Sequence, residues 1–221
     1  DPYKTTISGL FYQPVSLKDE ERDSYVYIAA ENRQSEPFVM LLPDSSVNDV
    51  NAWLEETGWQ AIADEQGLIL SVAQTKDGWT DAEMNYLNRL YSITHARGHY
   101  NAQKGNNYLI AYGDAVTLAQ KWLMQNPQHF ASAATYGQIG EIDEDYMAEC
   151  ASKATRVTGL ATGDLPMPIW FFVDEMDENA ETVLAYWNHA NNVSDEKYFT
   201  DLKDYTVTND FAQPATKWTL K

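Results

Sequence analysis

The residues Leu109–Val116, with the sequence LIAYGDAV, join an apolar run to a turn of small residues. The run TLAQKWLMQ follows, with the apolar spacing of a helix. This pattern is typical of a nucleophile elbow, a tight turn between strand and helix that presents a serine between small neighbours. Gly113 occupies the serine's position here, and glycine has no side chain that a substrate could acylate. The pattern therefore poses the question whether this turn performs catalysis.

Other residue types exclude several kinds of chemistry. Cys150 is the only cysteine, and no cluster of Cys and His has the spacing of metal ligands, so we expect no metal centre and no cofactor. The acidic stretch VDEMDE, residues 173–178, would suit only a weak calcium contact. A formal charge of −18, from 15 basic and 33 acidic residues, argues against binding to nucleic acid or to anionic lipid. There is no apolar run of about 18 residues, so no membrane span is expected.

Alternating strand and helix patterns position these residues. Strands are predicted within 3–14, 23–31, 37–43, 68–74, 106–113, 130–137 and 166–173, and helices over 49–67, 80–98, 114–127 and 179–192. Residues 16–23 are predicted as a charged hairpin loop, and Gly67 as the stop of the helix over 49–67. This alternation predicts a single α/β domain over residues 1–221, with a mostly parallel sheet flanked by helices.

Three segments in this order resemble the α/β-hydrolases of the polyhydroxybutyrate depolymerase and feruloyl and acetylxylan esterase group, over about residues 20–192. They are FVMLLPDSSVNDVNAWLEETGWQAIADEQGLILSVAQ from Phe38, YNAQKGNNYLIAYGDAVTLAQKWLMQNPQHFASAATYG from Tyr100, and IWFFVDEMDENAETVLAYWNHANN from Ile169. The resemblance implies an α/β-hydrolase fold with a degenerate elbow. Ala111 and Ala115 stand in for the two glycines of the family elbow.

The resemblance assigns the remaining site positions. Gly113 takes the nucleophile position, and Asp177 takes the position of the catalytic acid; the alternative is that Asp177 is simply part of the acidic loop. Asp114 is an alternative nucleophile, since aspartate can form covalent intermediates, but it comes one residue late; a solvent-exposed or helix-capping role is the simpler interpretation.

The oxyanion loop of the family corresponds to Pro43, Asp44, Ser45 and Ser46. Proline lacks an amide donor, and the charge of Asp44 has the wrong sign to stabilise an oxyanion. Ser45 or Ser46 could act as a displaced nucleophile, but no base lies nearby in the sequence, and two ordinary loop serines are the simpler interpretation.

The triad histidine and the last part of the fold are missing from this pattern. The family order is serine, acid, histidine. After Asp177 only His189 remains, within a predicted helix, while His95, His99 and His129 precede the acid. Beyond Asn192 there are two β-like runs and no closing helix, so we expect the sheet to lack its final strand–helix unit. We expect the tail to form an edge strand. A second polypeptide would complete the sheet; the alternative is that the tail closes a shortened sheet.

Two functions of different class remain open at this point. The first is an esterase-like protein without catalysis, acting as a binding or scaffold module with a glycan or polyester as ligand. The second is an active carboxylic-ester hydrolase for polyester, feruloyl or acetyl esters, completed by residues outside this chain. The missing serine and histidine favour the first, and whether the chain is an enzyme stays open. Because the family is largely exported, the resemblance implies a secreted protein.

Overall fold

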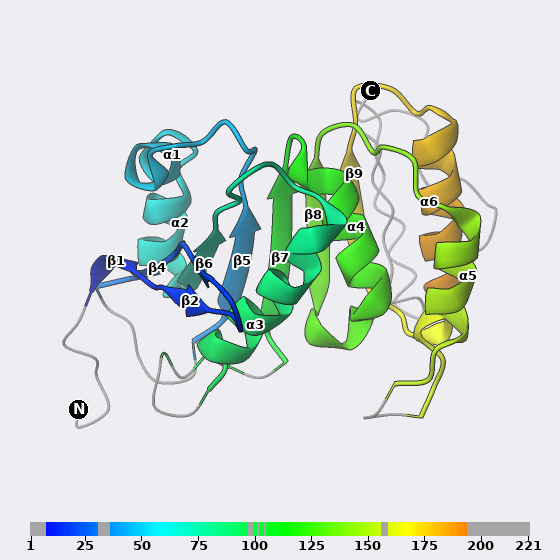
Figure 1. The fold of residues 1–221 in the computed structure, drawn as a ribbon, viewed down its shortest axis with the longest axis horizontal. Helices are drawn as coiled ribbons and strands as arrows, with labels where there is room; N and C mark the ends of the chain where they lie inside the picture. Colours follow the sequence, from blue (N-terminus) through cyan, green and yellow to red (C-terminus); the bar gives the residue numbers. More distant parts are fainter. Residues whose placement is uncertain are drawn as a thin grey trace. The chain divides into compact units, whose positions relative to one another are not determined.

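The computed structural model describes residues 8–30, 36–96, 100, 102–103, 105–155 and 159–193. Strands and helices alternate along most of this length (Figure 1). The strands are β1 Gly9–Tyr12, β2 Val15–Ser16, β3 Glu21–Arg22, β4 Ser24–Ile28, β5 Phe38–Leu42, β6 Ile69–Ala73, β7 Asn107–Tyr112, β8 Ser132–Tyr136 and β9 Ile169–Phe172. The helices are α1 Val50–Glu56, α2 Trp59–Gln66, α3 Met84–Thr94, α4 Ala115–Gln125, α5 Glu144–Ser152 and α6 Glu178–Ala190.

Seven strands form one sheet in the order β1-β4-β6-β5-β7-β8-β9, and β2 and β3 form a separate hairpin. The first strands are antiparallel, β1 to β4 and β4 to β6, whereas β5 with β6 and β8 with β9 are parallel. The mostly parallel sheet with flanking helices that the sequence predicts is therefore confirmed. The expected strands and the missing final unit beyond Asn192 fall on residues 194–221, outside the described residues.

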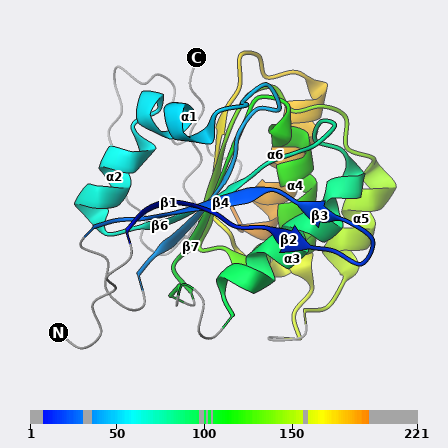
Figure 2. The same cartoon turned by 60° about the vertical axis from the view of Figure 1, so that its left-hand side comes forward.

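The chain divides into two compact units, Asp1–Ile110 and Ala111–Lys221, and each is described here by itself. In the first unit, all five residues of β5 and of β6 are buried, as expected for strands covered on both faces. Figure 2 shows α1 and α2 on one side of these strands and α3 on the other. Val39 and Leu41 of β5 belong to the same buried cluster as Leu54 of α1 and Ala63 of α2.

Two local predictions in the first unit are wrong. The single helix expected over residues 49–67 is two helices, because Gly58 takes a left-handed φ of 76° between α1 and α2. Gly67 ends the second of them, as predicted. The charged loop expected at residues 16–23 contains the β2–β3 hairpin, in which Val15 pairs with Arg22. Both of these residues are buried, which explains why the charged segment forms strand structure.

In the second unit, α4, α5 and α6 lie together on one side of β7, β8 and β9 (Figure 2). The buried amide of Gln120 on α4 links two neighbours. Its Nε2 donates to Thr135 Oγ1 of β8 at 3.2 Å, and its Oε1 accepts from Trp187 Nε1 of α6 at 2.8 Å. Gln120 therefore fixes the two helices to the sheet.

Cys150 lies on α5, a helix that the sequence analysis did not predict. The Cys150 side chain is buried, and burial raises the pKa of its thiol.

No helix in the described part of the chain combines the length and the apolar character needed to cross a membrane.

Candidate active site

The turn at Gly113 joins β7 to α4. The strand ends at Tyr112 and the helix begins at Ala115, so Gly113 lies at the carboxyl end of the strand, where the sequence places it. Its φ of 56° is in the left-handed region. Its N–H donates to the carbonyl of Tyr136 at 2.8 Å, and its own carbonyl accepts from Val116 N–H at 3.3 Å. Gly113 thus occupies a sharp strand-to-helix turn that is bonded to β8.

A second glycine makes this turn possible. Gly137, directly after β8, has a φ of 147°, and a Cβ built on it would lie 3.0 Å from Gly113 O and 3.1 Å from Gly113 N. The two backbones therefore approach as closely as the absence of a side chain at Gly137 allows. Ala111 and Ala115, on either side of the turn, are fully buried. The sequence analysis missed Gly137, although its position directly after a predicted strand was a usable signal.

Asp114 is the N-cap residue of α4, one residue beyond Gly113. It has helical dihedral angles, φ −70° and ψ −12°, and its exposed side chain makes no capping hydrogen bond. Its carboxylate is therefore displaced by one residue from the position at which an elbow presents its nucleophile.

Asp177 follows β9 and forms the N-cap of α6. Its backbone is extended, with φ −79° and ψ 178°, and its Oδ1 accepts from the N–H of Ala180 at 2.9 Å. A carboxylate at this position satisfies an unpaired amide of the first helical turn and interacts favourably with the helix dipole. The half-buried Asp177 side chain thus has a structural role that needs no histidine partner.

The histidines of the second unit lie away from Asp177. His189 is in the last turn of α6, twelve residues beyond Asp177. At 1.5 Å per helical residue, that separation is about 18 Å along the axis. The His189 side chain is 77% exposed and lies 3.9 Å from Asp164. His129 lies in the 3₁₀ turn Pro127–His129 before β8, at the opposite end of that strand from Gly137. Within the described part of this unit, no histidine stands beside the acid position.

The other two histidines belong to the first unit. The His95 ring has both nitrogens within hydrogen-bond distance of oxygen acceptors, Nδ1 at 2.8 Å from Tyr91 O and Nε2 at 3.0 Å from Asn107 Oδ1. Its ring also stacks on that of Tyr91. These contacts join α3 to the start of β7 and give His95 a structural role. His99 lies outside the described residues.

The loop after β5 holds Asp44, Ser45 and Ser46 in the first unit. Asp44 Oδ1 accepts from the backbone N–H of Ser46 at 3.0 Å and from its hydroxyl at 2.6 Å. This is an Asx turn, in which a side-chain oxygen replaces a backbone acceptor. The Asp44 carboxylate is therefore bound within its own loop, and the Ser46 hydroxyl donates to a carboxylate rather than to a base nitrogen. Ser45 is exposed.

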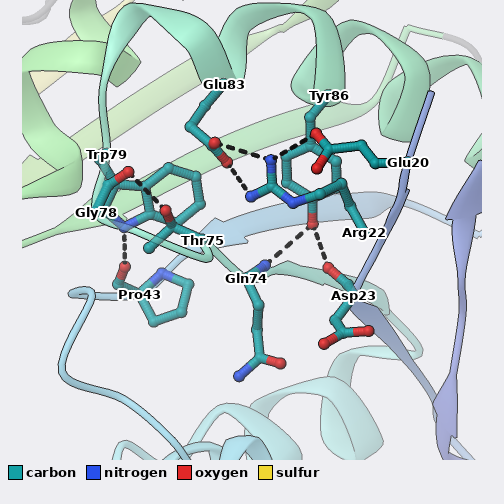
Figure 3. Close-up of polar contacts among 10 residues, drawn as sticks. All are labelled: Glu20, Arg22, Asp23, Pro43, Gln74, Thr75, Gly78, Trp79, Glu83 and Tyr86. Atoms are coloured by element: carbon teal, nitrogen blue, oxygen red, sulfur yellow. Dashed lines mark hydrogen bonds and ion pairs between the residues drawn. The ribbon is translucent and has the colours of Figure 1, made fainter. Parts of the chain in front are cut away.

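Trp79 fixes the start of this loop. Its indole N–H donates to the carbonyl of Pro43 at 2.8 Å, and Thr75 Oγ donates to the carbonyl of Gly78 at 2.6 Å to close the turn that carries it (Figure 3). The sequence analysis did not single out Trp79. Its position, in the short connection that follows a predicted strand, gave no indication of a partner 36 residues earlier.

A buried ion pair lies in the same unit (Figure 3). Arg22 of β3 donates two hydrogen bonds to Glu83, the one from Nη1 at 2.9 Å, and both side chains are less than 10% exposed. The hydrogen bond to Glu83 raises the pKa of Arg22. Its guanidinium lies 4.8 Å from the ring centre of Tyr86, and Glu20 lies 3.6 Å from Arg22.

Tyr86 extends this network into the sheet. Its hydroxyl donates to the carbonyl of Asp23 at 2.6 Å and accepts from the N–H of Gln74 at 3.0 Å. Burial raises the pKa of Tyr86. The network thus connects the β2–β3 hairpin with the end of β6 and the first turn of α3.

Aromatic side chains form a row across the second unit's strands, and Tyr112, Tyr136 and Phe172 are each the last residue of their strand. The rings of Tyr112 and Tyr136 stack at 5.1 Å between centres, and those of Tyr136 and Phe172 at 4.2 Å, with 2° between the latter planes. Trp170 meets Phe172 edge to face at 6.2 Å. We call these four residues the aromatic strip. It begins at the residue before Gly113, and the sequence analysis did not identify it.

The residues singled out from the sequence thus fall into two sets. Gly113, Asp114 and Asp177 lie in the second unit, at the carboxyl ends of β7 and β9. Asp44, Ser45 and Ser46 lie in the first unit, after β5. In the second unit, hydrogen bonds hold the turn at Gly113 and the helix cap at Asp177. In the first unit, hydrogen bonds from Ser46 to Asp44 hold the loop.

Comparison with known proteins yields structural but no sequence relatives. No protein-family model and no curated protein sequence matches the chain. The serine hydrolase FphF of Staphylococcus aureus, in a substrate-bound structure, has a TM-score of 0.57 at 11% identity over 84% of this chain and 87% of its own. Acetyl xylan esterase from Aspergillus awamori has a TM-score of 0.56 at 12% identity, over 82% and 80%. A ferulic acid esterase has a TM-score of 0.59 at 11% identity, over 98% and 90%.

At 11–12% identity these likenesses concern the fold. The solved structures are serine hydrolases and esterases by name. This chain has an α/β-hydrolase-like fold.

Proposed function

We propose that this protein is an esterase-like α/β-hydrolase that has lost catalysis and acts as a binding or scaffold module. The observation that carries the proposal is Gly113 in the elbow. The turn keeps a left-handed φ of 56° and its small buried neighbours, but the residue at its apex has no hydroxyl. Without a nucleophile at this point, an acyl-enzyme cannot form there.

The surrounding groups support the same proposal. Asp177 caps α6, Ser46 donates to Asp44, and His189 lies about 18 Å from Asp177 along α6. A hydrolytic triad needs its acid, its base and its nucleophile within hydrogen-bond reach of one another. The described groups of the second unit do not meet that requirement.

The solved structures that are similar in fold support a proposal for the ligand class. Acetyl xylan esterase and ferulic acid esterase are among the structures with this fold, so we propose an ester-bearing glycan or a polyester as ligand. Secretion is the matching proposal for location. No nucleic acid is proposed as partner, because a chain of charge −18 repels phosphate.

A fluorophosphonate probe with intact-mass detection tests the loss of catalysis. We expect no covalent adduct on the full chain, and no turnover of nitrophenyl acetate or of a feruloyl ester above the buffer rate. Gly113→Ser should restore neither, because it supplies no base. An adduct on Ser46, or turnover that survives repurification and disappears in Ser46→Ala, would overturn the proposal.

The ligand is tested separately, by sedimentation of the protein with insoluble xylan and with polyhydroxybutyrate granules. Retention on one of these supports, against cellulose as control, supports the binding function. Absence of retention on both contradicts the proposed ligand class and leaves the result of the probe experiment intact.

One observation favours the alternative of an active hydrolase. The elbow conformation is retained at Gly113, which is the part of the site that a partner's serine and histidine would have to complement. Ester turnover by material isolated with a second polypeptide, and lost when the two are separated, would establish this alternative.

A further inference from the structure

The connection between β6 and α3, residues 74–83, is fixed at both of its ends. At the first residue, the N–H of Gln74 donates to the hydroxyl of Tyr86 at 3.0 Å. At the last residue, the carboxylate of Glu83 accepts two hydrogen bonds from Arg22 of the β2–β3 hairpin. Figure 3 shows both ends of the connection in this network. The connection is therefore held by side chains of α3 and of the hairpin.

The middle of the connection contacts the loop that follows β5. Thr75 Oγ1 donates to the carbonyl of Gly78 at 2.6 Å, and Gly78 has a left-handed φ of 95°. This turn presents the next residue, Trp79, whose indole N–H donates to the carbonyl of Pro43 at 2.8 Å (Figure 3). The contact therefore reaches the residue at which the chain leaves β5.

A short hydrogen-bonded path joins Trp79 to the buried ion pair. The N–H of Glu83 donates to the carbonyl of Thr80 at 2.9 Å, so the backbone from Thr80 to Glu83 forms a closed 3₁₀ turn. Thr80 directly follows Trp79 in the chain. A displacement of the Glu83 backbone is therefore transmitted to Trp79 through a closed turn.

The network at the hairpin is buried and has little freedom to rearrange. Arg22 and Glu83 are each 6% exposed, and Tyr86 is fully buried. Paired hydrogen bonds between a guanidinium and a carboxylate fix the orientation of both groups. Separation of a buried ion pair is costly, because it leaves each charge without a partner and without water. The hairpin therefore sets the position of Glu83.

The loop that receives the contact from Trp79, residues 43–47, is closed on itself. Asp44 Oδ1 accepts from the N–H of Ser46, and the carbonyl of Asp44 accepts from the N–H of Val47, both at 3.0 Å. These bonds set the internal shape of the loop. The bond from Trp79 joins this loop to the connection 74–83.

We propose that the β2–β3 hairpin positions the loop 43–47 through the connection 74–83, and that Trp79 is the positioning residue. A molecule that binds to the hairpin and shifts Arg22 would then change the position of the loop. By thermodynamic linkage, a ligand that binds at the loop would change the affinity of the hairpin for that molecule by the same factor. Every contact in this path belongs to the first unit. The proposal goes beyond the function proposed above and does not rest on it.

Hydrogen exchange of the full chain, resolved by NMR, tests this proposal at the amide of Val47 and at the indole of Trp79. We expect Glu83→Gln to raise both exchange rates at least about tenfold, because the connection loses its charged anchor on the hairpin. The backbone amides of β6 should keep their protection, as should the indole of Trp187, which donates a hydrogen bond within the second unit. Unchanged exchange at Val47 and Trp79 overturns the proposal.

Two further variants separate positioning from general destabilisation. Glu20→Gln is the matched control, because Glu20 also contacts Arg22, at 3.6 Å, but is 45% exposed; we expect no change at Val47. Glu83→Asp keeps the charge, shortens the side chain by one methylene group and replaces Glu83→Gln if that variant unfolds the first unit. It should raise the exchange rate of Val47 at least about threefold while β6 stays protected. No rise in Glu83→Asp, or an equal rise in Glu20→Gln, overturns the proposal.

The double variant Trp79→Phe/Glu83→Asp decides whether Trp79 carries the effect. Phenylalanine has no indole N–H to donate to Pro43, so Trp79→Phe alone should raise the exchange rate of Val47. If the hairpin acts through Trp79, Glu83→Asp should add nothing in that background. Additive effects would show that the hairpin and Trp79 act on the loop independently, which contradicts the proposal.

Discussion

Gly137 is the residue on which the turn at Gly113 depends most directly. Gly137→Ala puts a Cβ about 3.0 Å from Gly113 O in a backbone region, φ 147°, that side chains rarely adopt. We expect this substitution to lower the free energy of unfolding by about 2–3 kcal/mol, since it adds a backbone clash to a strained dihedral angle. Chemical denaturation measures the change.

Gly159→Ala is the control for this experiment. Gly159 also has a left-handed φ, 72°, but nothing lies within 4 Å of the Cβ it would gain. We expect this variant to lose only about 1 kcal/mol, the penalty of the dihedral angle alone. Equal losses in the two variants would show that the close approach of Gly137 to Gly113 adds nothing.

At the scale of single residues, the sequence predicts roles that depend on neighbouring residues in the chain. It does not predict contacts between residues that are distant in the sequence. The position of Gly113 follows from LIAYGDAV because strand, turn and helix are consecutive. Gly137 and Trp79 act on backbone groups 24 and 36 residues earlier, and no local pattern reports such contacts. The role of Asp177 as a helix cap was visible, since aspartate before a helix commonly caps it.

At the scale of elements, the Arg22–Glu83 pair joins the β2–β3 hairpin to α3. Glu83→Gln leaves a buried guanidinium without its charged partner, and we expect it to destabilise the first unit by about 3–5 kcal/mol. Glu20→Gln is the control, because Glu20 also contacts Arg22, at 3.6 Å, but is 45% exposed.

The control should change the free energy of unfolding by at most about 1 kcal/mol, as an exposed pair does. Urea denaturation monitored by tryptophan fluorescence measures both variants. A loss in Glu83→Gln no greater than in Glu20→Gln would mean that the buried pair does not hold the hairpin.

Element types were predictable where apolar periodicity decides them. β5 and β6 are buried apolar runs, and α4 and α6 have helical spacing. The break at Gly58 was not predicted, because the apolar spacing of Trp53, Leu54 and Trp59 continues across it. The β2–β3 hairpin was missed because its charged residues suggest a loop, and only the distant Glu83 explains why Arg22 can be buried.

At the scale of the whole molecule, both units hold tyrosines that resist ionisation. Burial, with the hydrogen bond to Asp64, raises the pKa of Tyr27 to about 12 in the first unit. Burial raises the pKa of Tyr186 to about 12 in the second. Because the folded pKa exceeds the ordinary value near 10, the stability that these groups contribute is full below about pH 10 and is lost as pH rises through about 12.

We therefore expect the free energy of unfolding to fall between about pH 10 and about pH 12, in step with tyrosinate absorbance. Tyr27→Phe should make this fall less steep, because phenylalanine has no proton to lose. An unchanged slope in that variant would contradict the assignment.

The fold class was predictable because alternation of strands and helices leaves few topologies. The division into two compact units was not, since its boundary after Ile110 lies inside β7, where no linker composition exists. The place of Gly113 in a strand-to-helix turn was predictable, because strand, turn and helix are consecutive in the sequence. The roles assigned to Gly113, Asp177 and the loop at Asp44 stay predictions.

The buried Cys150 makes the motion of one unit observable through chemistry. It is the chain's only thiol, it is 4% exposed, and burial raises its pKa, so little thiolate is present at neutral pH. A disulfide reagent therefore modifies it at the frequency with which α5 opens to solvent. The native chain thus carries its own kinetic reporter for residues 111–221, and since residues 1–110 contain no cysteine, the modification rate refers to that unit alone.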